Sequence, residues 1–296
     1  MRILVVCGGV GDEREVSLCS GERVFEALSL AEHQVTLHRD NGEGASAVLR
    51  AAREADAVFL ALHGDGGEDG TWQAELEGAG IRHYTGSGPE ACALAMQKDA
   101  AKRRVAFFGV PCARGELCRE KGAKPPLPYP FIVKPNRGGS SVGLALIKSD
   151  GDWQNYTPSG DFLCESYLTG REFTVGILDG TATPAVEIRP HGGAYDYAHK
   201  YTAGASDELC PAPIEGSYAV RLAQLARASF FALGLRDYAR IDLRENALGE
   251  PCFLEANALP GMTKTSLFPL SASVMGLDMP ALCQRMCRMA ARRRLG

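Results

Sequence analysis

The sequence predicts an N-terminal α/β domain followed by a larger α+β region. The apolar run Ile3–Cys7 ends at two glycines and is followed by a helical pattern, which is the usual opening of an α/β unit. Short strand patterns then alternate with helical patterns as far as about residue 86. Farther along the chain, hairpin signals and a few helices replace this alternation, as is typical of α+β folds.

Each further element of the N-terminal region has its own pattern. Residues 33–38 (HQVTLH) alternate in polarity and predict a strand, and residues 46–55 predict a helix. Residues 57–62 (AVFLAL) are short and continuously apolar, as in a strand buried within a parallel sheet. The glycine-rich loop 63–70 (HGDGGEDG) leads into a helix that ends near Glu77.

The remaining two thirds predict several strands and helices. An Asp-Gly pair at 179–180 joins two strand patterns and indicates a β-hairpin. We place domain boundaries near residues 87 and 165, which gives the ranges 1–86, 87–165 and 166–296. The expected elements are one or two helices over 89–109, strands at 131–134, 144–148, 172–178 and 183–188, a helix at 218–233, strands at 238–243 and 252–255, and a helix at 280–294.

Composition excludes several classes of protein. A net charge of −4 argues against a general nucleic-acid binder, which usually has a basic surplus. The longest run without a charged residue, 265–277, contains proline and glycine and is too short to span a membrane. The first residues (MRILVVCGG) lack the length and cleavage site of a signal peptide. The ten cysteines show no CxxC motif or zinc spacing, so we expect reduced thiols and a cytoplasmic protein.

A glycine- and serine-rich loop, Gly138–Gly143, follows the predicted strand that ends at Lys134. Glycines let the backbone approach a ligand, and consecutive N–H groups can bind phosphate oxygens, to which the lysine adds a positive charge. The loop lacks the Walker A pattern. Taken alone, it is consistent with either a phosphate-binding loop or an ordinary flexible one.

Asp242, Glu255 and Asn257 lie at the ends of two predicted neighbouring strands. Glu255 and Asn257 are two residues apart, so an extended chain presents both on one face, and Arg240 shares a face with Asp242 in the same way. Two carboxylates and a carboxamide suit Mg²⁺ that also binds nucleotide phosphates. A surface pair of acids is the alternative interpretation.

Two further segments are candidates near the glycine turns. Acids in the sequence Glu13–Ser17 (EREVS) could be site residues or ordinary partners of a helix dipole. His63 opens the glycine-rich loop 63–70, and such a loop at a strand end is typical of a ligand site. A single histidine is, however, more often structural than catalytic.

Taken together, these segments resemble the D-alanine–D-alanine ligases of the ATP-grasp superfamily. The resemblance covers nearly the whole chain, with the motifs in the family's order. The matching segments are CGGVGDEREVSL, LHGDGGEDGTWQ, YTGSG, the lysine of AMQKDAAK, FIVKPNRGGSSVG, YLTGREFTV, YDYAHKY, RIDL and NALPGMTKTSLFP. The resemblance implies a Rossmann-like parallel α/β domain followed by an ATP-grasp fold of two α+β subdomains.

The resemblance also implies roles for individual residues. For ATP, it implies phosphate and adenine contacts from Lys98 and Lys134, adenine and ribose contacts from Glu165 and Glu172, phosphate cover from the loop with Ser140 and Ser141, and contact with the transferred phosphoryl group from Lys200. For the metal, it implies two Mg²⁺ (or Mn²⁺) ions on Asp242, Glu255 and Asn257. For the amino acids, it implies Glu15 and His63 around the first D-alanine, Arg240 and the N–H of Gly261 as the oxyanion site, Ser266 and the N–H of Leu267 on the second carboxylate, and a Glu15–Ser140–Tyr201 trio that positions the substrates.

The implied reaction joins two D-alanines for peptidoglycan synthesis. ATP would convert the first carboxylate to an acyl phosphate, and the second amine would attack it through a tetrahedral intermediate. We expect residues 189–206 to form a lid that excludes water, with Gly192, Gly193 and Gly204 as hinges and Lys200 and Tyr201 on it. The resemblance also implies a homodimer through the N-terminal region.

Four alternatives remain open at the level of sequence. The nearest are a D-alanine–D-lactate ligase and another ATP-grasp carboxylate–amine ligase. A dinucleotide-dependent oxidoreductase would explain the opening, but CGGVGDER lacks the full GxGxxG spacing and the acids near residue 250 would have no role. A nucleotide-binding module without turnover is the fourth alternative, and ADP release that depends on D-alanine would exclude it.

Overall fold

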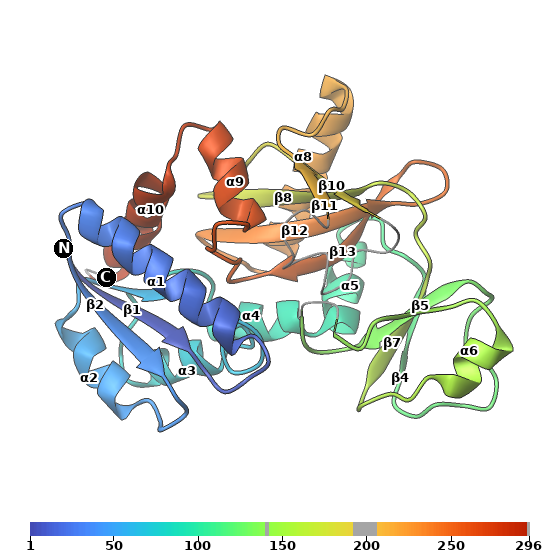
Figure 1. Cartoon of the computed structure of the whole chain (residues 1–296), viewed down its shortest axis with the longest axis horizontal. Coiled ribbons are helices and arrows are strands. Elements are labelled where there is room, and N and C mark those ends of the chain that lie inside the picture. The colour runs from blue at the N-terminus through green and yellow to red at the C-terminus, as the bar shows by residue number, and fades with distance from the viewer. Residues whose placement is uncertain (140–141, 192–205, 295–296) are drawn as a thin grey trace.

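The computed structural model describes residues 1–139, 142–191 and 206–294. It contains three β-sheets, each with its own helices (Figure 1). In that view the N-terminal sheet lies at the left and a four-stranded sheet at the right, with a six-stranded sheet between and above them. The mixed α/β and α+β class predicted from the sequence is therefore confirmed.

The N-terminal sheet is parallel, with strand order β2-β1-β3. Its central strand is buried along almost its whole length, as the continuous apolar run predicted. Figure 1 shows α1 lying along this sheet. The elements are β1 (Arg2–Gly8), α1 (Arg14–Leu30), β2 (Gln34–Asp40), α2 (Ser46–Glu54), β3 (Ala57–Leu60) and α3 (Thr71–Gly78).

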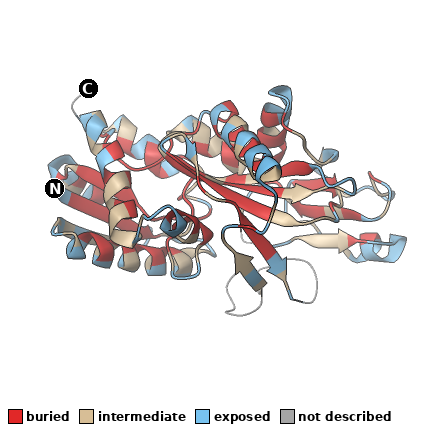
Figure 2. Cartoon of the chain, turned by 90° about the horizontal axis from the view of Figure 1, so that it is seen from above, coloured by how far each residue is buried: buried red, intermediate tan, exposed pale blue. Residues whose placement is uncertain are grey.

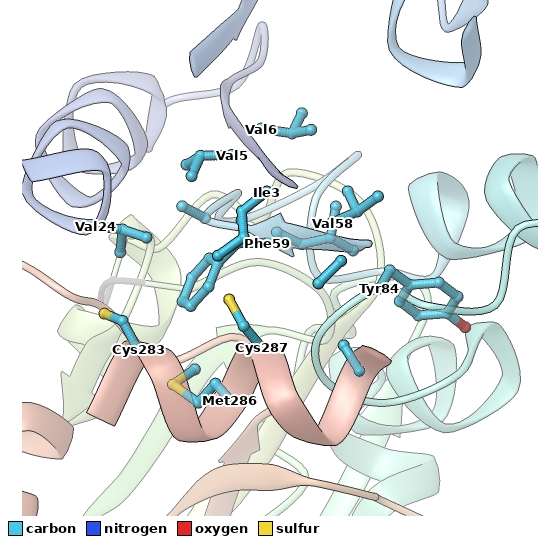
Figure 3. Packing of buried hydrophobic residues seen from close by; sticks show 14 of the residues in the cluster. Ile3, Val5, Val6, Val24, Val58, Phe59, Tyr84, Cys283, Met286 and Cys287 are labelled. Atoms are coloured by element: carbon cyan, nitrogen blue, oxygen red, sulfur yellow. The ribbon is translucent and has the colours of Figure 1, made fainter. Parts of the chain in front are cut away.

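The hydrophobic core of this sheet is completed by the far end of the chain. Helix α10 (Met279–Ala291), which continues into η1 (Arg292–Arg294), packs on the N-terminal sheet and on α1. Figure 3 shows Cys283, Met286 and Cys287 of α10 directed toward Phe59 and its neighbours. Residues 279–291 therefore share the N-terminal core, and the range 166–296 is not one separate packing unit.

The four-stranded sheet is antiparallel, with order β4-β7-β5-β6. Its small core centres on Phe131, Trp153 and Phe162, whose rings lie at centroid distances of 5.8 and 6.4 Å along that series. Trp153 comes from a short helix that caps the sheet. The elements are β4 (Gly115–Cys118), β5 (Phe131–Pro135), β6 (Ala145–Ile147), α6 (Asp150–Asn155) and β7 (Phe162–Ser166).

The six-stranded sheet is also antiparallel and runs β11-β10-β8-β12-β13, with β9 paired to β8. Three helices bury one face of it, so the strands are mostly red in the burial view of Figure 2. Two of these, α4 and α5, come from the predicted range 87–165 and nevertheless pack here. The elements are α4 (Pro89–Met96), α5 (Lys98–Phe107), β8 (Glu172–Leu178), β9 (Thr181–Ala182), β10 (Val186–Pro190), β11 (Ser206–Leu209), α8 (Gly216–Ala232), β12 (Tyr238–Glu245), β13 (Pro251–Asn257) and α9 (Leu267–Val274).

The hairpin predicted at the Asp-Gly pair is present. Asp179 and Gly180 both have positive φ, at 54° and 73°, as a tight two-residue hairpin turn requires. The returning strand is interrupted, however, because Pro184 has no N–H to donate to a ladder. The predicted strand 183–188 is therefore wrong in its bounds, since β9 ends at Ala182 and β10 begins at Val186.

The ends of the predicted lid are held side by side. Strands β10 and β11 pair with Pro190 opposite Ser206, so the segment 189–206 leaves and re-enters the same sheet. Residues 192–205, which include Gly192, Gly193 and Gly204, lie outside the described residues. Among the helices that are described, none is long and apolar enough to cross a membrane.

Gly21 tests the packing of α1 on β1. A Cβ at this position would lie 2.3 Å from the Cβ of Cys7, so Gly21→Ala must push the helix off the strand. We expect the free energy of unfolding to fall by about 1–3 kcal/mol in urea titrations. Gly78→Ala is the control, because its Cβ would meet open space at the end of α3 and should leave stability unchanged or slightly raised. Equal effects of the two substitutions would contradict this packing.

Candidate active site

A cavity of about 200 Å³, open to solvent, lies where segments of all three sheets meet. Most of the predicted site residues line it, although they are spread over more than 200 positions of the chain. The fold thus brings together both the expected nucleotide residues and the expected amino-acid residues. The predicted residues in its lining are His63, Lys98, Lys134, Glu165, Glu172, Arg240, Asp242, Glu255, Asn257, Gly261, Ser266 and Leu267.

Glu15 does not line the cavity, whereas Glu13 does. Helix α1 begins at Arg14, and Glu15 in its first turn is exposed. Two helical positions differ by about 200° around the axis, so the two acids cannot face the same way. The Glu13 carboxylate instead lies against the glycine loops, where a Cβ on Gly64 would sit 2.7 Å from Glu13 Oε2. Of the two acids, Glu13 is therefore the one that faces the cavity.

Four other predicted site residues have no described position relative to the cavity. Ser140 and Ser141 of the glycine loop, and Lys200 and Tyr201 of the expected lid, lie outside the described residues. The flanking Gly138, Gly139 and Val142 do line the cavity. The described part of the glycine loop is thus at the site.

Strands β12 and β13 place four predicted residues on one face of the six-stranded sheet. Arg240 lies opposite Asn257, and Asp242 lies opposite Glu255. Because side chains alternate across a strand, all four project to the side that carries the cavity. The prediction from two-residue spacing is confirmed at this point.

Asp242 is the buried centre of this group. Its carboxylate accepts two hydrogen bonds from the Arg240 guanidinium, both at 2.9 Å, in a bidentate pair. Thr174 Oγ1 donates to the same carboxylate at 2.6 Å, and Asn257 Nδ2 at 3.0 Å. Asp242 therefore orients Arg240 at the wall of the cavity.

The oxygen ligands here fit a divalent cation that also binds phosphates. Within the described residues, no three His, Cys, Asp or Glu side chains cluster closely enough to hold a metal by themselves. Asp242, Glu255 and Asn257 offer two carboxylates and one carboxamide on one face of the sheet. Mg²⁺ is commonly held by one or two carboxylates and completed by substrate phosphates and water.

His63 is buried and neutral, and both of its ring nitrogens are engaged. Nδ1 lies 3.1 Å from the carbonyl oxygen of Leu259, which can only accept, so Nδ1 carries the proton. Nε2 accepts from the hydroxyl of Ser20 at 3.0 Å, and that oxygen accepts the N–H of Met262 at 3.2 Å. Burial lowers the pKa of His63 to about 4. His63 thus anchors the segment that contains Gly261.

Glu68 is a site residue that the motif analysis did not single out. It accepts hydrogen bonds from the N–H groups of Gly64 and Leu259, at 3.2 and 3.1 Å. Burial, together with the neighbouring Glu13 carboxylate, raises the pKa of Glu68 to about 8. Two acidic groups facing one part of the cavity make a site suited to a ligand ammonium.

Basic and aromatic groups also line the cavity. Lys134, near the end of β5, pairs with Glu165 of β7 at 2.7 Å. Glu172 pairs with Arg244 at 3.1 Å, and the Arg244 guanidinium lies over the ring of Tyr167. Sequence reasoning missed Arg244, although it lies two residues after Asp242 and so on the same strand face.

The start of α9 supplies a site for an anion. Ser266 is the residue before the helix, and Leu267 is its first residue, so the N–H of Leu267 belongs to the unpaired first turn. Such N–H groups attract carboxylates. Gly261 lies against Ser266, since a Cβ on Gly261 would be 2.7 Å from Ser266 Oγ. Only glycine fits there without moving Ser266.

The neutral state of His63 gives a test of stability against pH. As pH falls from about 6.5 to 4, the unfolded chain takes up a proton that folded His63 does not, so stability is lost toward acid by up to about 3 kcal/mol. His63→Gln should lack this loss, so the stability gap between wild type and variant should narrow toward pH 4 in urea titrations. Parallel curves over this range would contradict the assignment.

Comparisons with known proteins agree with this geometry. A family model described as "D-ala D-ala ligase C-terminus" matches residues 113–288. The D-alanine–D-alanine ligase of Oleidesulfovibrio alaskensis is 41% identical over 97% of this chain and 95% of its own. The crystal structure of the Bacillus anthracis enzyme complexed with ATP superposes with a TM-score of 0.86, at 27% identity, over 100% of this chain and 99% of its own.

A related specificity is also represented among the similar structures. The D-Ala:D-Ser ligase of Enterococcus faecalis superposes with a TM-score of 0.81, at 26% identity, over 98% of this chain and 99% of its own. With a family model over residues 113–288 and a 41% identical relative along nearly its whole length, this chain belongs to the D-alanine–D-alanine ligase family.

Proposed function

We propose that this protein uses ATP to ligate two D-alanines into D-alanyl-D-alanine, for peptidoglycan synthesis. The observation that carries the proposal is that one cavity joins buried lysines, a carboxylate–carboxamide face and a helix N-terminus. A carboxylate does not react with an amine unaided, so the first D-alanine must be activated. Transfer of the γ-phosphoryl group to its carboxylate oxygen makes an acyl phosphate and releases ADP.

At the nucleotide end, Lys98 and Lys134 bind the phosphates, and Glu172 binds the ribose. Both lysines are buried at the cavity wall, where their charges are little screened by water. Lys200 and the loop with Ser140 and Ser141 complete the phosphate contacts, as the resemblance implies. Two Mg²⁺ or Mn²⁺ ions on Asp242, Glu255 and Asn257 would neutralise charge during phosphoryl transfer.

At the amino-acid end, Glu13 binds the ammonium of the first D-alanine, in the role first expected of Glu15. Its carboxylate faces the cavity beside the glycine loops and near Glu68. Ser140 and Tyr201 join Glu13 in positioning the substrates. His63 acts through the backbone of Leu259 and Met262, since its own nitrogens are engaged.

The second D-alanine binds through its carboxylate at the start of α9, to Ser266 and the N–H of Leu267. Its amine then attacks the acyl carbon. Arg240 and the N–H of Gly261 stabilise the oxyanion of the tetrahedral intermediate, and loss of one such donor typically costs roughly 3–4 kcal/mol. Arg240 is already oriented for this by Asp242. Phosphate leaves with the former carboxylate oxygen, and the dipeptide remains.

The proposal extends to the setting of the enzyme. We place it in the cytoplasm as a homodimer that contacts its partner through the N-terminal region. The ten cysteines are all free thiols, as suits a reducing compartment. We assign the ranges 1–86, 87–165 and 166–296 by chain order to the substrate domain and the two ATP-grasp subdomains, although α4, α5 and α10 each pack on the sheet of another range.

ADP release is the first test. With ATP and Mg²⁺, D-alanine should trigger ADP release and yield D-alanyl-D-alanine by mass, whereas L-alanine should not. Glu255→Gln should abolish turnover because it removes a metal ligand, and Glu250→Gln, at the far end of the same hairpin, is the control. Folded protein that binds ATP but releases no ADP with D-alanine would overturn the substrate assignment. A D-lactate or D-serine product would correct the second substrate.

Glu13 and Glu15 give a matched pair of variants. Glu13→Gln should lower kcat/KM for D-alanine by at least about a hundredfold, since it removes the charge that pairs with the ammonium. Glu15→Gln, two residues away and exposed, should stay within about threefold of wild type. Steady-state kinetics with varied D-alanine decide between them. A larger loss of kcat/KM in Glu15→Gln than in Glu13→Gln would instead assign the ammonium of the first D-alanine to Glu15.

A further inference from the structure

Lys102 is a buried lysine that does not line the cavity, yet it contacts a residue that does. It lies one helical turn after Lys98 on α5, and its side chain is 8% exposed. Its Nζ is 2.6 Å from Oε1 of Glu165. Lys134 approaches the other oxygen of the same carboxylate, with Nζ 2.7 Å from Oε2. One carboxylate is thus shared by two ammonium groups.

We propose that Lys102 is a positioning residue for the nucleotide, which neutralises Glu165 so that Lys134 keeps its positive charge for the phosphates. The inference rests on the proposed use of ATP in this cavity. The trio of Lys102, Lys134 and Glu165 carries one net positive charge. Without Lys102, Glu165 and Lys134 would form a neutral pair, and a triphosphate would meet one charge fewer.

Burial strengthens the interactions among the charges of Lys102, Lys134 and Glu165. The Glu165 side chain is 3% exposed and that of Lys134 is 10%, so water screens neither well. Burial alone would raise the pKa of Glu165, but Lys134 and Lys102 together hold it below its usual value. Burial lowers the pKa of Lys102, and Glu165 opposes that effect. With Nζ 2.6 Å from Oε1, Lys102 and Glu165 form a buried ion pair.

Lys102 also joins the two ATP-grasp sheets. Its Nζ donates a hydrogen bond to the carbonyl oxygen of Phe253 on β13, at 3.0 Å. Glu255, a proposed metal ligand, follows two residues later on the same strand. Helix α5 therefore links Glu165 of the four-stranded sheet to β13 of the six-stranded sheet through one amino group.

Nucleotide binding in the absence of D-alanine tests the inference. We expect Lys102→Met to raise the Kd of Mg·ATP, measured by calorimetry, roughly tenfold or more, because a charge-assisted contact is weakened. KM for ATP should rise in parallel, while KM for D-alanine stays close to wild type. Lys121→Met is the control, since Lys121 donates to the carbonyls of Gln154 and Tyr156, lies over Trp153 and does not line the cavity.

The double variant Lys102→Met/Glu165→Gln separates charge balance from structure. Its trio again carries one positive charge, so it should bind Mg·ATP several-fold more tightly than Lys102→Met does. Full recovery is not expected, because Glu165 lines the nucleotide cavity itself. Affinity as weak as, or weaker than, that of Lys102→Met would overturn the proposal, as would wild-type affinity in the single variant. Lys102→Gln removes the charge but keeps a donor, and it replaces Lys102→Met if that variant does not fold.

These outcomes do not depend on the amino-acid substrate. If the enzyme binds Mg·ATP but ligates no D-alanine, the proposed function fails and the role of Lys102 is still decided by the binding data. If wild-type protein binds no Mg·ATP, the use of the nucleotide itself is contradicted. Circular dichroism and urea titration of each variant establish that the measured protein is folded.

Discussion

The register between β12 and β13 is the constraint on which the rest of the site depends. It sets Arg240 opposite Asn257 and Asp242 opposite Glu255, on the face of the sheet that is free of α4, α5 and α8. If one strand slipped by one residue, its side chains in this group would point into the hydrophobic core instead of toward the cavity. A bulge after Asp242 then shifts the pairing, so that Leu254 reaches the cavity as well. Bulges of this kind commonly redirect side chains beside active sites.

Each of the three sheets contributes different residues to the cavity. The N-terminal sheet brings Glu13 and His63 to the cavity, and the four-stranded sheet brings Lys134. The six-stranded sheet brings the proposed metal-binding face and the start of α9. An acyl phosphate needs all of these at once, since it must be made beside the nucleotide and consumed beside the amine before water reaches it. Helices that pack across the predicted ranges, α10 above all, fix the sheets relative to one another.

Local patterns in the sequence account for much of the fold and for the strand face that carries Asp242, Glu255 and Asn257. The spacing of Glu255 and Asn257 was sufficient because a strand alternates strictly, so residue parity alone assigns the face. Glu13 and Glu15 were not separable in this way, because the phase of α1 depends on where the helix begins and on the loops it meets. Lys102 shows the same limit: its four-residue spacing from Lys98 is visible in the sequence, but its burial against Glu165 is a tertiary contact.

Activation of the first carboxylate as an acyl phosphate in this cavity is the step on which the rest of the proposed reaction depends. The most direct measurement uses D-alanine labelled with ¹⁸O in its carboxylate, with ATP and Mg²⁺, and mass analysis of the inorganic phosphate released. The carboxylate oxygen that bonds to phosphorus departs with it, so we expect one labelled oxygen in phosphate for each dipeptide formed. Dipeptide formation with unlabelled phosphate would contradict it.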